Sequence, residues 1–411
     1  MLHVNATTSQ PSHMAGKPES SKEAQTQPAK PKKLFLVTTE TSGDLLGGRL
    51  LRELKTMVPA LDVRGVGGDL LQAEGMHQTY DVRDFNVMGL VEVLSQLRRL
   101  KGMFNHLVAE LREWRPDVIV LVDAPDFNLR FAKAVAGLGI PIIYYVSPQV
   151  WAWRKGRAKK IARLVDHMLV LFEFEKAIYA ELDLPTTWVG HPLVDELKTG
   201  GSREEFFASQ GLDPQRPLVA LAPGSRNREV TSLLPVMARA AAQRLDRYQF
   251  AIPIAPALDR TLVADLLGQV ETELDRPLTS SIRLLPGLMR PLMRHADAAI
   301  VASGTATLET GLLHTPMIVG YRLKQLSYAL ASRLVKVEHV ALVNIVLGKR
   351  VVPELIQDDF CPEAILTHLD ALIEPGETRD RVLAEFDRLE HILGGGGAAR
   401  RAATVVKDYL A

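Results

Sequence analysis

The feature that most constrains the fold is a short apolar run that ends abruptly at two carboxylates. Residues 116–122 read Pro-Asp-Val-Ile-Val-Leu-Val, and Asp123 and Asp126 follow, separated by Ala-Pro. An unbroken, mostly β-branched run is typical of a strand that is buried on both faces of a parallel sheet. Ligands of open α/β sheets bind outside the carboxyl ends of the strands. The sequence therefore predicts that Asp123 and Asp126 lie at a ligand-binding edge, although either residue could instead satisfy turn amides.

Strand-like runs alternate with amphipathic helices through both halves of the chain, which predicts parallel sheets covered by helices. Gly190-His191-Pro192 breaks the pattern, and a polar, glycine-containing segment follows at 198–202. We therefore expect His191 to be a hinge residue bonded to backbone rather than a catalytic base. The expected strands are 34–38, 63–66, 118–122, 140–146, 168–172 and 186–189, then 218–222, 250–254, 298–302 and 317–319.

Four regions follow from this pattern. Two α/β domains are expected at 33–197 and 203–375, and C-terminal helices at 376–411, interrupted by Gly394 to Gly397. Residues 1–32 are rich in Ser, Gln, Pro, Lys and Ala, and such a composition cannot bury enough apolar surface to offset the entropy of ordering. We expect a disordered N-terminal tail there.

Composition excludes several functional classes. The 411 residues carry a net charge of only +1, so the chain as a whole has no electrostatic attraction to nucleic acid. The single cysteine, Cys361, excludes an internal disulfide and a multi-cysteine metal site. No Asp-x-Asp or His-x-x-x-His spacing occurs, so we expect neither a metal nor a cofactor. No apolar run approaches the ~20 residues that span a bilayer, and no signal-peptide core is present, which predicts a cytosolic or membrane-peripheral protein.

The first predicted strand is followed by a polar turn that could bind a ligand, Glu40-Thr41-Ser42-Gly43-Asp44. It matches neither the mononucleotide nor the dinucleotide glycine loop. The spacing of Thr41 and Asp44 fits a capping box. A capped helix start also presents amides to an anion, which makes Ser42 and Gly43 candidate ligand-binding residues.

Two turns of the second half suggest a nucleotide site. Ser303, Gly304 and Thr305 follow a strand and open a helix, where small residues and the helix dipole favour a diphosphate. Glu309 lies on the same helical face as Thr305 and has no capping partner, so ribose hydroxyls are its expected partners. Arg226, at the equivalent turn after 218–222, can bind a phosphate bidentately. The sequence thus predicts a nucleotide-diphosphate site in the second domain that faces a carboxylate in the first.

A third pattern suggests a membrane surface. The predicted helix 87–111 begins with a second apolar face, and a basic run at 154–163 follows two tryptophans. The alternative is a buried helix start and an ordinary solvated basic helix. The residues expected to meet a bilayer or an acylated acceptor are Val87, Met88, Leu90, Val91, Leu94, Trp151, Trp153, Arg154 and Arg157.

These motifs together resemble the lipid A disaccharide synthase family. The resemblance runs in order from about Leu34 to the C-terminus, and the motifs that carry it are Glu40-Thr41-Ser42-Gly43-Asp44, Met88-Gly89 with Glu92-Val93-Leu94, Asp123-Ala124-Pro125-Asp126-Phe127-Asn128, Tyr145-Val146-Ser147-Pro148, Trp151-Ala152-Trp153-Arg154, Gly224-Ser225-Arg226 with Glu229, Ala302-Ser303-Gly304-Thr305 with Leu308-Glu309, and Val319-Gly320-Tyr321-Arg322. Two positions depart from the family pattern: Thr39 replaces a glycine, and Val343 replaces the proline before Asn344.

The resemblance implies a GT-B fold, in which two Rossmann-like parallel-sheet domains face each other across a cleft. It implies transfer of 2,3-diacylglucosamine from its UDP conjugate to 2,3-diacylglucosamine 1-phosphate, giving a β-1,6-linked disaccharide 1-phosphate and UDP. It also implies a peripheral position on the cytosolic face of the inner membrane, contact with that anionic surface, and Asn344 at the nucleotide. The resemblance does not decide whether the protein forms a homodimer.

The implied mechanism is a single displacement with inversion. A carboxylate must accept the proton of the acceptor 6-hydroxyl, and Asp123 is the predicted base, with Asp126 in reserve. Arg226 and the helix after Ser303 would stabilise the leaving UDP. Two other classes compete. One is a UDP-N-acetylglucosamine 2-epimerase or another UDP-sugar transferase on the same fold, and the other is a non-catalytic lipid- or nucleotide-binding protein.

Overall fold

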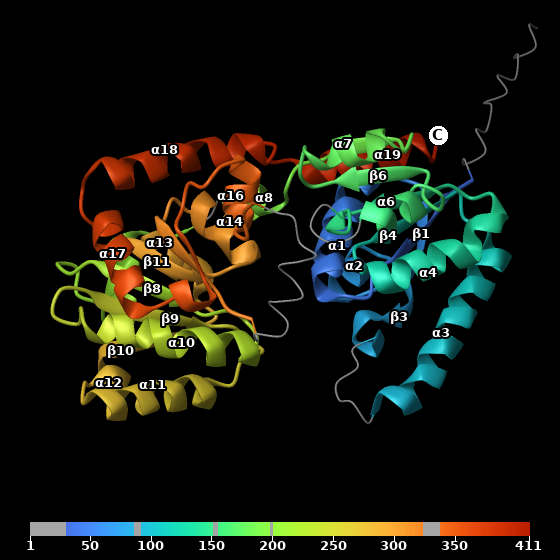
Figure 1. The fold of residues 1–411 in the computed structure, drawn as a ribbon. Coiled ribbons are helices and arrows are strands. Elements are labelled where there is room, and N and C mark those ends of the chain that lie inside the picture. Colours follow the sequence, from blue (N-terminus) through green and yellow to red (C-terminus); the bar gives the residue numbers. More distant parts are fainter. Residues whose placement is uncertain (1–29, 86–91, 151–154, 198–199, 324–337) are drawn as a thin grey trace, which may run out of the picture.

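Two parallel β-sheets, each covered by helices, form the molecule (Figure 1). The computed structural model describes residues 30–85, 92–150, 155–197, 200–323 and 338–411. Apart from Lys32, which begins the first strand and lies within the predicted tail, the two sheets fall within the two predicted domain ranges, while the boundaries themselves remain a prediction. The tail predicted at 1–32 lies almost entirely outside the described residues, which begin at Lys30.

The first sheet has seven strands in the order β3-β2-β1-β4-β5-β6-β7, and every neighbouring pair is parallel. Its strands are β1 (Lys32–Val37), β2 (Leu61–Gly67), β3 (His77–Asp81), β4 (Val118–Val122), β5 (Ile142–Tyr145), β6 (His167–Val170) and β7 (Thr186–Trp188). The helices between and after them are α1 (Thr41–Met57), α2 (Asp69–Ala73), η1 (Val82–Phe85), α3 (Glu92–Trp114), α4 (Pro125–Val135), η2 (Ala136–Leu138), α6 (Lys155–Ile161), α7 (Glu175–Ala180) and α8 (Leu193–Glu196).

The second sheet has six strands in the order β10-β9-β8-β11-β12-β13, again all parallel. Its strands are β8 (Leu218–Ala222), β9 (Gln249–Ile254), β10 (Ile282–Pro286), β11 (Ala298–Ala302), β12 (Met317–Tyr321) and β13 (Glu354–Ile356). Its helices are α9 (Arg203–Gln210), α10 (Asn227–Ala242), α11 (Arg260–Leu274), α12 (Leu278–Ser281), α13 (Met289–His295), α14 (Thr305–Leu312), α16 (Leu342–Leu347), η3 (Gln357–Asp359) and α17 (Pro362–Ile373), followed by α18 (Glu377–Ile392) and α19 (Ala398–Asp408).

The unbroken apolar runs are explained by burial on both faces of each sheet. Along β4, Val118, Val120 and Val122 face one core cluster, while Ile119 and Leu121 face the other, and all five are fully buried. A strand with one solvated face would alternate apolar and polar residues instead. The prediction that residues 118–122 form a doubly buried parallel strand is therefore confirmed.

Strand order reverses at the same place in both sheets. In the first sheet β1 lies between β2 and β4, and in the second β8 lies between β9 and β11. Successive connections leave such a point in opposite directions, which opens a crevice at the carboxyl ends of the strands. The turns after β4 and β11, which carry Asp123 and Thr305, occupy these two equivalent positions.

All ten predicted strands are present, but β3, β10 and β13 were not predicted. Each is an edge strand of its sheet. Helix α4 begins at Pro125, directly after the Asp123 turn, because proline fits the first turn of a helix. The helix expected at 87–111 is confirmed from Glu92 onward, and residues 86–91 lie outside the described residues.

The chain crosses between the two sheets twice. The first crossing runs through Gly190 and His191 into α8. The second runs from α18 through Gly394–Gly397, four glycines with φ between +63° and +99°, into α19, which packs on α1 of the first domain (Figure 1). The two crossings are bonded to each other, because His191 N donates to Leu393 O at 2.8 Å and Arg401 Nε donates to Val189 O at 2.8 Å.

The capping box predicted for Thr41 and Asp44 is wrong. Helix α1 has Glu40 at its N-cap, with no side-chain capping bond. The buried Asp44 carboxylate instead accepts hydrogen bonds from the N–H groups of Gly68 (2.7 Å), Leu70 (3.0 Å) and Leu71 (3.2 Å), at the start of α2. Asp44 therefore fixes the turn after β2 to α1, and it does so across 24 residues of sequence.

Asp44→Ala should lower the free energy of unfolding by roughly 2 kcal/mol, because it leaves three amides without their acceptor. Urea unfolding with an unchanged m-value measures this loss. Asp246→Ala, which removes an exposed aspartate, is the control and should change stability by less than about 0.5 kcal/mol. Equal stability of the two variants would contradict the capping role.

Candidate active site

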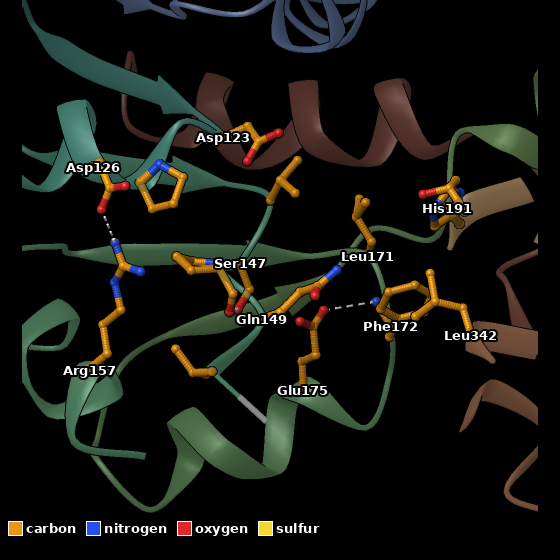
Figure 2. Close-up of a pocket in the computed structure, with 15 residues that line it drawn as sticks. Asp123, Asp126, Ser147, Gln149, Arg157, Leu171, Phe172, Glu175, His191 and Leu342 are labelled. Carbon is orange, nitrogen blue, oxygen red and sulfur yellow. Dashed lines mark hydrogen bonds and ion pairs between the residues drawn. The ribbon is translucent and has the colours of Figure 1, made fainter. Parts of the chain in front are cut away.

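A cavity of about 640 Å³ opens at the carboxyl ends of β4, β5 and β6. Residues from both domains line it, because Thr305 and Leu342 of the second domain belong to its wall. Figure 2 shows Leu342 beside Phe172 and His191. The first-domain residues that line it are Asp123, Pro125, Asp126, Val146, Ser147, Pro148, Gln149, Val150, Arg157, Leu171, Phe172, Glu175 and His191.

Asp123 is held by its own backbone in an uncommon conformation. Asp123 and the next residue, Ala124, have φ of +50° and +42°, and such left-handed residues other than glycine often occur at functional sites. The Asp123 carbonyl accepts hydrogen bonds from Tyr144 Oη at 2.6 Å and Asn128 Nδ2 at 2.8 Å. Both of these side chains are fully buried. The turn after β4 is thus fixed, and with it the position of the Asp123 carboxylate.

The environment of Asp123 favours its action as a base. Burial raises the pKa of the Asp123 carboxyl, the negative charge of Glu40 raises it further, and the backbone N–H of Ala124 opposes the shift. Glu40 is exposed at the N-cap of α1. A carboxylate with a raised pKa binds a proton more strongly and is therefore a better proton acceptor near neutral pH.

Asp126 lies in a different environment, although it lines the same cavity. Its side chain is 93% exposed and forms an ion pair with Arg157 at 3.0 Å (Figure 2). It is therefore largely in contact with solvent, in contrast to the more buried Asp123 carboxyl. Arg157 is 25% exposed and points into the cavity region, so the structure places at the cavity a cation that the sequence had grouped with the membrane surface.

Two further polar groups form the cavity wall. His191 Nδ1 accepts a hydrogen bond from Leu193 N at 3.3 Å, and burial lowers the pKa of His191 to about 4, so the ring is neutral at physiological pH. The predicted backbone bonding of His191 is confirmed. Glu175, which sequence reasoning missed, is buried and accepts a hydrogen bond from Phe172 N at 3.1 Å. No residue pattern in the chain marks Glu175 as part of a site.

A second cavity, of about 390 Å³, lies at the carboxyl ends of β8, β9 and β11. It brings together five of the residues predicted to bind nucleotide, and Thr305 lines both cavities. The two cavities therefore adjoin at Thr305. The five residues are Arg226, Ser303, Gly304, Thr305 and Glu309.

One guanidinium and two carboxylates line this second cavity, those of Arg226, Glu229 and Glu309. Arg226 lines the cavity and is 80% exposed, and its Nη1 bonds Glu229 Oε1 at 2.8 Å. Gly304, at the N-cap of α14, has φ of +151°, a conformation that favours glycine, and it adds no side chain over the amides of that helix start. Glu309 lies one turn into α14 and is 18% exposed.

Three predicted nucleotide residues are placed elsewhere. Ser42 and Gly43 line neither of these cavities, and Gly43 is instead closely packed, because a Cβ there would lie 1.9 Å from Thr38 Oγ1. Asn344 is fully buried and uses its whole amide within the protein. Its Nδ2 donates to Val352 O and Glu354 Oε1, and its Oδ1 accepts from Val351 N and Val352 N. This geometry does not support a nucleotide contact by Asn344.

The predicted membrane surface is largely outside the described residues. Val87, Met88, Leu90, Val91, Trp151, Trp153 and Arg154 all lie there, and Leu94 lies in α3 without a described side chain. Within the described ranges no helix is long and apolar enough to cross a membrane. Nor do those ranges contain a group of three or more His, Cys, Asp or Glu side chains that could hold a metal ion.

The fold and the paired cavities define the class of protein. A putative UDP-N-acetylglucosamine 2-epimerase from Listeria monocytogenes superposes with a TM-score of 0.61 at 13% identity, covering 93% of this chain and 97% of that one. The calicheamicin glycosyltransferase superposes with a TM-score of 0.56 at 16% identity, covering 93% and 98%. At such identities the likeness is one of fold. The predicted GT-B fold, two parallel-sheet domains across a cleft, is confirmed.

Sequence comparison narrows the class to one family. The family model described as lipid-A-disaccharide synthetase matches residues 34–396. A lipid-A-disaccharide synthase of Syntrophus aciditrophicus is 41% identical over 382 residues, covering 92% of this chain and 98% of that protein. One from Geobacter sulfurreducens is 38% identical over 381 residues, covering 92% and 97%. The chain belongs to the lipid-A-disaccharide synthetase family, and the predicted role in lipid A disaccharide synthesis is confirmed at the level of that family.

Asn344→Ala should destabilise the protein by about 2 kcal/mol or more, because it leaves the buried Val351 and Val352 amides without their acceptor and removes one of the donors to Glu354. UDP affinity of the folded variant should stay close to that of the parent. Thermal unfolding and calorimetry measure the two effects. Asn105→Ala, at an exposed position of α3, is the matched control. An Asn344→Ala variant with normal stability and lost UDP affinity would instead support the original prediction that Asn344 contacts the nucleotide.

Glu40→Gln should move the acid limb of the kcat/KM profile to lower pH. Asp123, the predicted base, must be deprotonated to act, so activity is expected to fall as pH falls through its pKa. That pKa is raised by burial and by Glu40, so removing the Glu40 charge lowers it. Glu53→Gln, further along α1, should leave the limb unchanged. An acid limb that stayed in place in Glu40→Gln would show that another group sets it.

Proposed function

We propose that the protein transfers 2,3-diacylglucosamine from UDP-2,3-diacylglucosamine to the 6-hydroxyl of 2,3-diacylglucosamine 1-phosphate. The products are the β-1,6-linked disaccharide 1-phosphate and UDP. Membership of the family supports the overall reaction. The observation that carries the mechanism is that the Asp123 cavity and the Arg226 cavity adjoin at Thr305.

Inversion requires the base and the leaving group to lie on opposite sides of the anomeric carbon. Asp123 approaches from the first domain, and Arg226 and the start of α14 approach from the second. Asp123 accepts the proton of the acceptor 6-hydroxyl while the oxygen of that hydroxyl attacks the anomeric carbon of the donor. The bond to the UDP oxygen breaks in the same step, and the charge that develops on UDP is stabilised by Arg226 and by the amides and dipole of α14.

The larger cavity takes the acceptor in this proposal. The 1-phosphate of the acceptor needs a cationic partner. Among the residues that line the larger cavity, Arg157 supplies a guanidinium. Guanidinium groups bind phosphate bidentately, so the phosphate can replace the exposed Asp126 carboxylate as partner of Arg157. Asp126 then has an electrostatic role near the acceptor phosphate, and Asp123 alone is the base.

The acyl chains of the substrates require a surface of the protein that contacts the membrane. Both substrates carry acyl chains, so the acceptor cavity must open toward a bilayer. The apolar residues between Val87 and Leu94, with Trp151, Trp153 and Arg154, are the proposed contact with the anionic cytosolic face of the inner membrane. This part of the proposal rests on the sequence, because those segments lie outside the described ranges.

Asp123→Asn should lower kcat by about 10²-fold or more, because the amide cannot accept the proton. The carbonyl contacts of residue 123 are backbone contacts, so the turn and UDP affinity should be retained. Asp126→Asn is the matched control and should change kcat by less than about tenfold, because Asp126 is exposed and, in this proposal, lies beside the acceptor phosphate rather than the reacting hydroxyl. Transfer rates with both lipid substrates, together with UDP calorimetry, test the assignment. Collapse of turnover in Asp126→Asn but not in Asp123→Asn would exchange the two roles.

A further inference from the structure

Four charged side chains form a continuous series from the first domain to the donor cavity. Arg49 of α1 bonds Glu196 of α8 at 2.8 Å, and Glu196 bonds Arg290 of α13 at 2.5 Å. Arg290 in turn bonds Glu309 of α14, which lines the donor cavity. Charges alternate along the series, so each carboxylate lies against a guanidinium.

The contact between Arg290 and Glu309 uses only one carboxylate oxygen. Arg290 Nε and Nη2 approach Glu309 Oε1 at 3.1 and 3.0 Å. Within the described part of the chain, Glu309 Oε2 has no hydrogen-bond partner. Arg290 thus holds the carboxylate in one orientation and leaves the second oxygen for a ligand. A ligand hydroxyl that donates to Oε2 finds its acceptor already oriented, which reduces the entropy lost on binding.

Arg290 is also anchored outside the donor cavity, because Nη2, which bonds Glu309 Oε1, donates to Glu196 Oε2 as well. Its partner Glu196 is only 7% exposed and ends the short helix that follows the first crossing between the domains. A buried carboxylate of this kind needs its cationic partners, because an unpaired buried charge is strongly unfavourable. Arg290 cannot turn away from Glu309 without also leaving Glu196, so the second contact reinforces the first.

We propose that Arg290 is a positioning residue that orients Glu309 toward the ribose hydroxyls of the donor nucleotide and anchors it to the inter-domain segment through Glu196. The inference rests on the proposed function, in which Glu309 accepts hydrogen bonds from ribose. It adds a residue that does not touch the substrate and yet sets how well the site recognises ribose. Loss of Arg290 should therefore weaken recognition of the hydroxyls specifically, rather than of the diphosphate.

The experiment compares UDP with 2′,3′-dideoxy-UDP by calorimetry on the full chain. The parent protein should prefer UDP by about tenfold or more, because a hydrogen bond to a charged acceptor is lost with the hydroxyls. Arg290→Gln should reduce that preference to less than about threefold, mostly through weaker UDP binding. Arg290→Lys should lie between the two, because an ammonium keeps the charge but not the planar fork. A purely structural defect would weaken both ligands by the same factor and leave the preference intact.

Glu385→Gln is the matched control. Glu385 also joins two cations, Lys349 at 2.7 Å and Arg388 at 2.8 Å, and it lies in α18 away from the donor cavity. It should keep the parent preference. If Arg290→Gln does not fold, the lysine variant decides by the same ratio. A parent-like preference in the Arg290 variants would overturn the positioning role alone. A parent protein that does not discriminate between the two ligands would overturn the ribose assignment of Glu309, and the positioning role with it.

Discussion

The geometry of the site depends on one constraint, the parallel arrangement of strands in both sheets. Parallel strands place all their carboxyl ends at one edge, and the reversal of strand order at β1 and β8 opens a crevice there. Asp123 follows β4 and Thr305 follows β11, so each lies at the switch point of its own sheet. Because the two domains face each other along these edges, Asp123 and the start of α14 lie in adjoining cavities.

The sheets place Asp123 and Glu309 only approximately, and polar contacts with neighbouring side chains then fix the orientation of each residue. The Asp123 turn has two consecutive left-handed residues, and such a turn persists only where its surroundings fix it. Here the buried Tyr144 and Asn128 side chains fix it through the Asp123 carbonyl. In the second domain Arg290 has the corresponding effect on Glu309. In both cases the group proposed to act is held by neighbours that are not among the residues lining its cavity.

The central elements and the carboxylate at the strand end could be predicted because they depend on local sequence. A strand buried on both faces must be apolar throughout, and the residue that ends it is visible in the sequence. Edge strands such as β3 contain exposed polar residues, so periodicity does not reveal them. Asp44 and Asn344 could not be placed because their partners are distant in sequence or belong to folded loops. Spacing alone could not separate Asp123 from Asp126, because the difference between them is burial and the partner Arg157.

The central claim is a single displacement across the junction of the two cavities. The most direct test incubates the purified protein with UDP-2,3-diacylglucosamine and 2,3-diacylglucosamine 1-phosphate, then identifies the lipid product by mass spectrometry and its anomeric configuration by nuclear magnetic resonance. The account predicts one disaccharide 1-phosphate with a β-1,6 linkage for each UDP released. An α-linked product, an epimerised UDP-sugar or hydrolysis of the donor without a disaccharide would contradict it.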